Sequence, residues 1–169
     1  IEETGIAQIV RDARILPIYE GTNGIQAMDL VVRKIIGDKG LAINELIVDM
    51  RKSLSSLIPG SPLLGSQIDR FKDSVDDLEK TVSLLLKHST NMKFSGSVAF
   101  DVLMMTSTIT AAWQMLVSAE RAQLAFESNK VSSEFFDDKT TTAQYFIDSI
   151  LPRYVGHFIT ISSTDTGVK

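Results

Sequence analysis

Glu20 is the residue of this chain whose type and setting are best suited to chemistry. It lies between an aromatic residue, Tyr19, and a glycine, Gly21, in a short link between two stretches of helical periodicity. A carboxylate in such a setting can lose its water when a ligand covers it, which raises its pKa and suits it to act as a general base. The alternative interpretation is that Glu20 is a solvated acid in a surface loop.

The link around Glu20 is framed by helix signals on both sides. Pro17 ends the helix before it, because proline lacks an N–H group and disfavours helix in the preceding residue. Thr22 or Asn23 can cap the helix after it, and Gln26 follows Asn23 by three residues as in a capping box. These signals place the carboxylate just before the N-terminus of a helix.

Residues 11–26 read RDARILPIYEGTNGIQ, and this run resembles the C-terminal signature of the acyl-CoA dehydrogenases. These flavin enzymes introduce a 2,3-double bond into acyl-CoA thioesters. The resemblance implies that Glu20 is the catalytic base, which abstracts the α-proton while FAD accepts hydride, and that Gly21 belongs to the acyl-CoA pocket. It further implies that an electron-transfer flavoprotein or a similar carrier reoxidises the FAD.

The resemblance also assigns the three residues after Gly21 to the cofactor. Thr22, Asn23 and Gly24 would lie against the flavin. Gly24 stands where the family usually has Gln or Glu, so only a backbone contact to the cofactor would remain at this position. The longer run EGTNGIQAMDL is more similar to one branch of the family, the larger dehydrogenases that carry an extra C-terminal helical domain.

The start of the chain suggests a piece of a longer protein. The first residue is Ile1, no signal-peptide pattern follows, and helical periodicity begins within a few residues. We therefore expect a piece cut from its parent by design or by proteolysis. The resemblance then implies that most of the FAD and acyl-CoA sites lie upstream, so that the piece alone carries the base but is inactive and binds no FAD.

Apolar residues recur at spacings of three and four along most of the chain, which predicts an all-α protein. Helices are expected over about residues 4–16, 24–36, 41–57, 65–87, 96–128 and 141–161, with a bend or a split at Pro152. Loops are expected at 88–96 and 129–140, with Asp137 and Asp138 ready to cap the last helix. We predict an up-down bundle of about four helices, preceded by what the resemblance identifies as the last two helices of the acyl-CoA dehydrogenase core.

A glycine-bounded segment, residues 37–40, divides the chain. Its sequence, GDKG, is typical of a helix stop with a left-handed residue. We predict a first part, 1–37, that ends the dehydrogenase core and carries the motif, and a second part, 38–169, that is a helical extension without chemistry. The first part has apolar faces without upstream partners, so we expect a dimer, a swapped arrangement or packing on the bundle to cover them.

Composition argues against several classes of function. The formal net charge is −4, so the chain has no basic excess to neutralise nucleic-acid phosphates, and we expect no nucleic-acid partner. The absence of cysteine excludes disulfides and thiolate catalysis. His88 and His157 lack metal-ligand spacing, and we expect no metal site. The stretch between Asp101 and Glu120 has no charge, but its Ser, Thr and Gln residues make it too polar for a transmembrane segment, so we expect a core helix with Trp113 inside.

We predict from these features the C-terminal part of an FAD-dependent acyl-CoA dehydrogenase. Its parent would act on an acyl-CoA, form a homo-oligomer and reside in the bacterial cytoplasm, or in the mitochondrial matrix if the source is eukaryotic. The alternative function is a non-catalytic helical module that assembles subunits.

Overall fold

The computed structural model describes residues 2–18, 22–56 and 65–167. Its elements, in chain order, are a 3₁₀ turn η1 (Glu2–Thr4), α1 (Ile6–Ala13), α2 (Asn23–Met28), a π-helical segment η2 (Asp29–Ile36), α3 (Leu41–Ser56), α4 (Gly65–Lys87), α5 (Met92–Glu127), α6 (Ser133–Tyr145), a π-helical segment η3 (Phe146–Ile150), a 3₁₀ turn η4 (Leu151–Arg153) and α7 (Tyr154–Gly167). The described residues contain no strand, and the predicted all-α class is confirmed.

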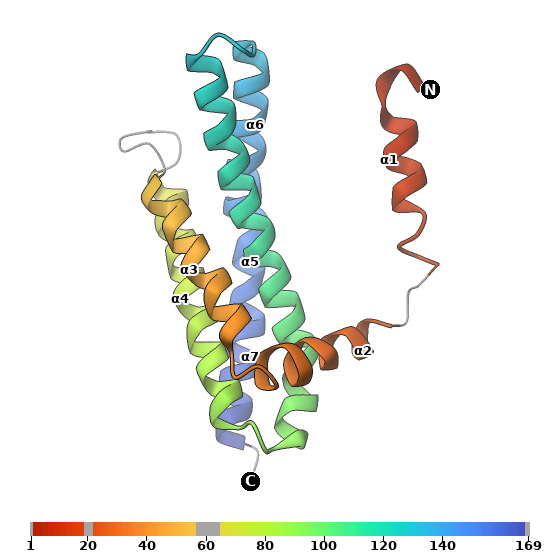
Figure 1. Ribbon diagram of the computed structural model, residues 1–169, viewed down its shortest axis with the longest axis vertical. Helices are drawn as coiled ribbons and strands as arrows, with labels where there is room; N and C mark the ends of the chain where they lie inside the picture. The colour runs from red at the N-terminus through yellow and green to blue at the C-terminus, as the bar shows by residue number, and fades with distance from the viewer. Residues whose placement is uncertain (1, 19–21, 57–64, 168–169) are drawn as a thin grey trace.

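Four rods form an up-down bundle: α3, α4, α5, and α6 continued by α7 (Figure 1). Successive rods run in opposite directions, as the sequence predicted. The rods pack through a single cluster of buried apolar side chains, whose largest members are Phe71, Phe94, Ile35, Ile47, Met50, Leu78, Leu85, Met105, Ile109, Leu116, Ile147 and Leu151.

Helix α5 lies at the centre of this packing. It contacts α2, α4, α6 and α7, and buried residues recur along it from Phe94 to Ala122. These neighbours explain why its middle carries no charge. By length and composition α5 could also cross a membrane, and 39% of its most apolar window is buried inside the structure. The core helix of a globular protein meets the same criteria.

The predicted loop at 129–140 is wrong. Helix α6 begins at Ser133, because the Ser132 hydroxyl accepts a hydrogen bond from the Phe135 N–H at 3.2 Å and so caps the helix several residues earlier than expected. Asp137 and Asp138 therefore lie inside the helix. Helix α5 likewise begins at Met92, earlier than the expected residue 96.

The predicted interruption at Pro152 is confirmed. The rod changes from α to π at Phe146 and to 3₁₀ at Leu151, and regular α-helix resumes at Tyr154. Proline cannot donate a backbone hydrogen bond, so the helical ladder must rearrange around it.

The predicted left-handed turn in segment 37–40 is also confirmed. Lys39 has φ 60° and Gly40 has φ 78°. The Asp38 carboxylate accepts hydrogen bonds from the Gly40 N–H at 2.9 Å and the Ala42 N–H at 3.0 Å, which caps the start of α3.

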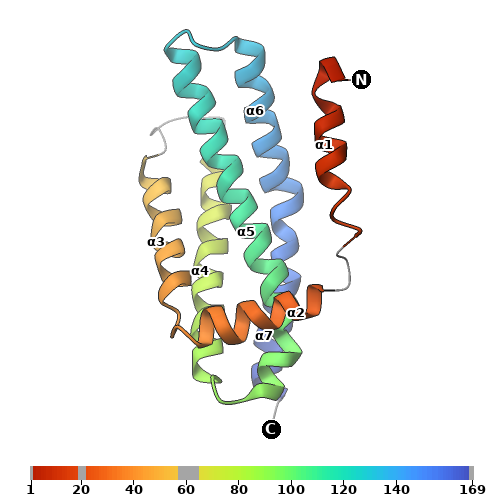
Figure 2. The same ribbon diagram turned by 45° about the vertical axis from the view of Figure 1, so that its right-hand side comes forward.

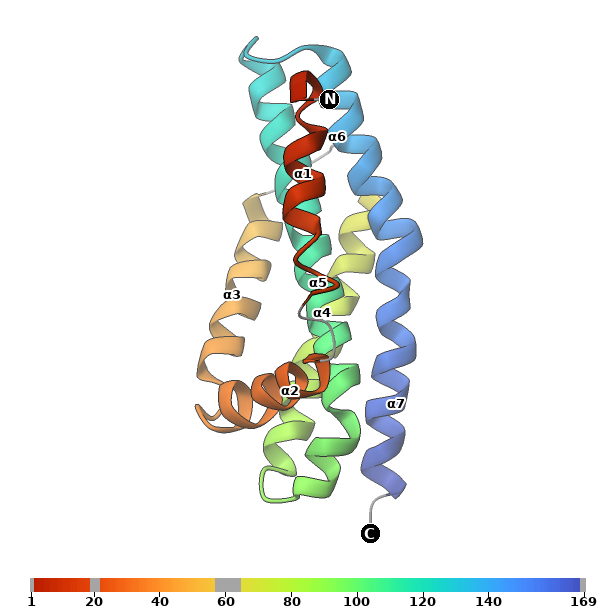
Figure 3. The same ribbon diagram turned by 90° about the vertical axis from the view of Figure 1, so that its right-hand side faces the viewer.

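The helix formed by α2 and η2 lies across the bundle near the end where α3 and α5 begin (Figures 2 and 3), whereas α1 stands away from the bundle (Figure 1). Packing on the bundle, one of the three expected arrangements, is thus observed for this second helix. The apolar side chains of α1 remain uncovered: Ile6, Ile9 and Val10 are 58%, 67% and 54% exposed. The division of the chain at residue 37 stays a prediction.

Candidate functional site

The predicted site residues fall on both sides of a limit of the described structure. Glu20 and Gly21, the predicted base and acyl-CoA contact, lie outside the described residues. Thr22, Asn23 and Gly24, the predicted flavin contacts, are described and form the start of α2. The structure therefore shows what holds the predicted flavin-contact end of the motif in place.

The predicted capping box is wrong. Thr22 is the N-cap of α2 through its backbone carbonyl, which accepts a hydrogen bond from the Gln26 N–H at 2.9 Å. Its side chain makes no capping hydrogen bond. The N–H groups of the first turn of α2 thus receive no capping hydrogen bond from the Thr22 side chain.

The first turn of α2 is open to the surroundings. Asn23 and Gly24 are exposed, and, apart from the neighbouring residues and the backbone of the helix itself, no atom of the described residues lies within 4 Å of the place where a Cβ on Gly24 would stand. Ile25, which follows, is 68% exposed. A flat group such as an isoalloxazine ring could therefore approach the backbone at Gly24 closely. These residues fit one wall of a flavin site.

The opposite side of the same helix is closed. Ala27, Val31 and Ile35 are 1%, 0% and 1% exposed and belong to the bundle core. Element α2 packs on α5, and η2 packs on α5, α4 and α3. The helix that follows the motif thus has one face on the bundle and, at its N-terminal turn, an open face.

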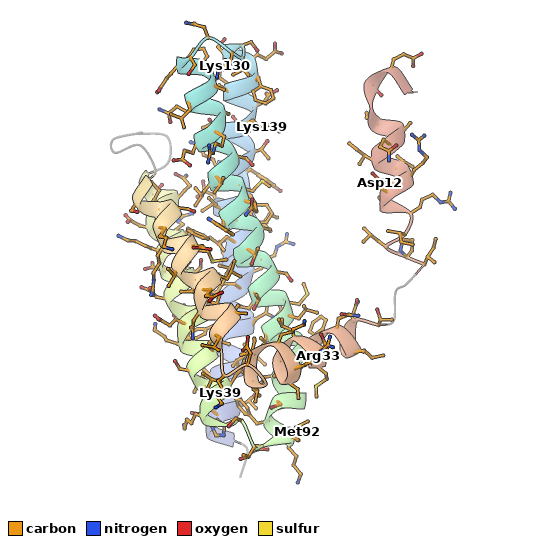
Figure 4. The ribbon with its side chains drawn as sticks, viewed as in Figure 1. Asp12, Arg33, Lys39, Met92, Lys130 and Lys139 are labelled. Carbon is orange, nitrogen blue, oxygen red and sulfur yellow. The ribbon has the colours of Figure 1, made fainter. Side chains whose placement is uncertain are left out.

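An ion pair lies on the outer side of η2. The Arg33 guanidinium donates to the Asp29 carboxylate at 2.9 Å, one helical turn away, and this hydrogen bond lowers the pKa of Asp29. Both groups reach solvent, so the pair contributes little stability. Figure 4 shows Arg33 with Lys39 and Met92 toward this end of the molecule, and Lys130 and Lys139 toward the other.

The two histidines of the chain take part in contacts that the sequence did not indicate. His88 pairs with Asp165, which also receives the Lys87 ammonium at 3.0 Å, and His157 pairs with Asp101 at 2.7 Å between Nδ1 and Oδ1. Both pairs tie α7 to the rest of the bundle. The histidine and the aspartate are 77 residues apart in the first pair and 56 in the second, so no local spacing in the sequence could reveal either pair. No group of three or more potential metal ligands exists among the described residues.

Comparison with known proteins identifies the bundle. Residues 43–168 match the family described as acetyl-CoA dehydrogenase C-terminal like. The chain is 34% identical to 3-methylmercaptopropionyl-CoA dehydrogenase of Ruegeria pomeroyi, over 99% of this chain and 28% of that protein. It is 26% identical to a broad-specificity linear acyl-CoA dehydrogenase of Mycobacterium tuberculosis, over 90% of this chain and 26% of that protein. It is 24% identical to butyryl-CoA dehydrogenase of Syntrophomonas wolfei, over 98% of this chain and 28% of that protein.

The chain spans little more than a quarter of the length of these curated relatives. The expected branch was the larger dehydrogenases, of which 3-methylmercaptopropionyl-CoA dehydrogenase is an example, and that protein is among the relatives found. Because the family match covers most of the chain and includes all of α4 to α7, the chain belongs to the family of acyl-CoA dehydrogenase C-terminal-like domains.

Proposed function

We propose that this chain is the C-terminal part of an FAD-dependent acyl-CoA dehydrogenase whose catalytic base is Glu20. One observation carries the proposal. The YEGTNG segment, residues 19–24, runs into the helix that packs on the family's bundle, in a chain related over nearly its whole length to 3-methylmercaptopropionyl-CoA dehydrogenase. The residue type suits the reaction, because removal of a proton next to a thioester carbonyl requires a base.

The Glu20 carboxylate would remove the proton from the α-carbon of the acyl-CoA as a hydride leaves the β-carbon, and the electrons of the broken Cα–H bond would form the new double bond. FAD, when bound, is the hydride acceptor. Gly21 would contact the acyl-CoA, and Thr22, Asn23 and Gly24 would contact the flavin. Exclusion of water by the bound thioester would raise the pKa of Glu20 toward working pH. The Glu20 carboxylate must also lie within about 3 Å of the α-proton.

The described residues would supply only one wall of such a site, so we propose that the 169-residue chain by itself binds no FAD and has no activity. An electron-transfer flavoprotein or a similar carrier would reoxidise the parent enzyme. The parent would be a homo-oligomer of the cytoplasm, or of the mitochondrial matrix in a eukaryote.

The test is Glu20→Gln in a parent protein that includes the upstream residues. Gln keeps the size of the side chain but cannot accept the proton. The variant should retain FAD, seen by its visible absorbance, and should lose the bleaching that substrate causes under anaerobic conditions. Glu45→Gln, at an exposed acid of α3, is the matched control and should bleach as the wild type does. Bleaching of Glu20→Gln near the wild-type rate would refute the assignment.

A second candidate function, a non-catalytic assembly module, is favoured by the uncovered apolar face of α1. Three of its side chains are more than half exposed, which is unusual for a helix in a finished assembly. Two measurements separate the two functions. An inactive Glu20→Gln parent, with self-association of the chain unchanged on changing Ile9 to Asp, supports the enzyme fragment. Normal activity of that variant, together with self-association of the chain that is lost on changing Ile9 to Asp, supports the assembly module.

A further inference from the structure

The connection between the motif and the bundle is one continuous helix fixed at its far end. It starts as α2, whose first two residues, Asn23 and Gly24, are the last two of the motif, continues as η2, and ends in the turn 37–40, where the Asp38 carboxylate caps the start of α3. A displacement of this helix on the bundle would therefore be transmitted to the motif.

Three buried side chains hold this helix on the bundle, and we call them the seat: Ala27, Val31 and Ile35. They are spaced by four residues. In an α-helix, residues four apart overshoot a full turn. In the wider turns of a π-helix, with hydrogen bonds from residue i to i−5, they fall short of one. The change from α to π after Met28 therefore keeps all three on the face that packs on α5, α4 and α3.

Gly37 permits the π-helical geometry. Its N–H donates to the Val32 carbonyl at 2.9 Å, five residues back, as the π-helical ladder requires. A Cβ on Gly37 would stand 2.5 Å from the Arg33 carbonyl oxygen, which is too close for any side chain. The glycine thus allows the ladder to continue to the turn, and the register of the seat depends on it.

We propose that the bundle positions the catalytic motif through the seat, so that Ala27, Val31 and Ile35 are positioning residues for the reaction of the parent enzyme. This inference rests on the proposed function. Ala27 is the first buried residue after the motif and follows Glu20 by seven positions. A movement of about 1 Å in a catalytic group can lower a rate about 100-fold, so a small shift of the helix is enough to matter.

The proposal is tested with Ala27→Val in the parent enzyme. The two added methyl groups have no room at a residue that is 1% exposed, so the helix must move away from α5. The matched control is Ala143→Val, at a fully buried alanine of α6 that lies outside the seat. We expect flavin reduction by substrate to be about 10- to 100-fold slower in Ala27→Val than in Ala143→Val, at equal FAD content and similar melting temperature.

Two further measurements keep the test decisive. If Ala27→Val does not fold, Ala27→Gly is compared with Ala143→Gly, and the first must lower the rate of flavin reduction more than the second. In the 169-residue chain, amide hydrogen exchange over α2 should be faster in Ala27→Val than in Ala143→Val. Equal rates of flavin reduction, or equal exchange over α2, would overturn the proposal.

The result for Glu20→Gln separates a failure of the proposed function from a failure of the seat. If Glu20→Gln bleaches normally, the proposed function fails whatever the Ala27 variants do. If Glu20→Gln is inactive and Ala27→Val reduces its flavin as fast as Ala143→Val does, the seat fails and the proposed function stands.

Discussion

Truncation of Ile35 tests whether the helix after the motif and the bundle share one core. Ile35 is 1% exposed and lies on η2, which packs on α3, α4 and α5. Ile35→Ala removes three buried carbon atoms, worth about 0.8 kcal/mol each, and leaves a cavity that raises the loss. Because three helices border the site, it cannot collapse easily, and we expect a loss of about 3 kcal/mol in the free energy of unfolding.

The loss is measurable by thermal unfolding of the 169-residue chain, followed by circular dichroism. For a chain of this size it corresponds to a melting temperature lower by roughly 6–12 °C, in a single cooperative transition. Leu41→Ala, at a residue of α3 that is 68% exposed, is the control and should change the free energy of unfolding by less than about 0.5 kcal/mol. An unchanged melting temperature for Ile35→Ala, or two separate transitions, would show that residues 22–36 fold independently of the bundle.

The remaining predictions concern the turn after η2 and the docking of α7. Gly40 has φ 78°, and a Cβ there would stand 3.2 Å from the Leu86 side chain, so Gly40→Ala should lower the free energy of unfolding by about 1–2 kcal/mol or more. Gly96 lies in the open first turns of α5, so Gly96→Ala should raise the free energy of unfolding by roughly 0.5–1 kcal/mol. Denaturant unfolding measures both, and equal effects would contradict the explanation. The Lys87 ammonium, and after it the paired histidine, lower the pKa of Asp165 below 3.8. Its stabilising contribution is therefore present above that pH and is lost as the pH falls through the lowered pKa. As the pH is lowered through this range, the melting temperature of Asp165→Asn should fall less steeply than that of the wild type. Parallel plots of melting temperature against pH for the two proteins would refute the linkage.

The bundle could be predicted from the sequence because its rods follow helical periodicity closely. Positions such as Phe71, Val75, Leu78, Val82 and Leu85 recur at spacings of three and four, and all five are buried. The start of α6 was missed because two capping signals compete. Asp137 and Asp138 are strong caps by type, but the earlier Ser132 is the residue that the folded chain uses.

The π-helical segments could not be predicted, because a spacing of four residues is compatible with both α- and π-helices. The buried set Ala27, Val31 and Ile35 has the same pattern in either geometry, and the choice depends on packing against three other helices. The assignment of Glu20 stays a prediction, and it could be made from the sequence because it depends on a short contiguous run of residues. The two histidine pairs join residues far apart in the chain, so the sequence could not indicate them.

The central claim is that Glu20 removes the α-proton of an acyl-CoA, and exchange of that proton with solvent measures this step directly. The parent enzyme is incubated with an acyl-CoA in D₂O, and deuterium at the α-carbon is followed by proton NMR. We predict exchange with the wild-type enzyme and a rate about 10²–10⁴-fold lower with Glu20→Gln, at equal FAD content. Undiminished exchange in that variant would show that another group is the base and would contradict the account.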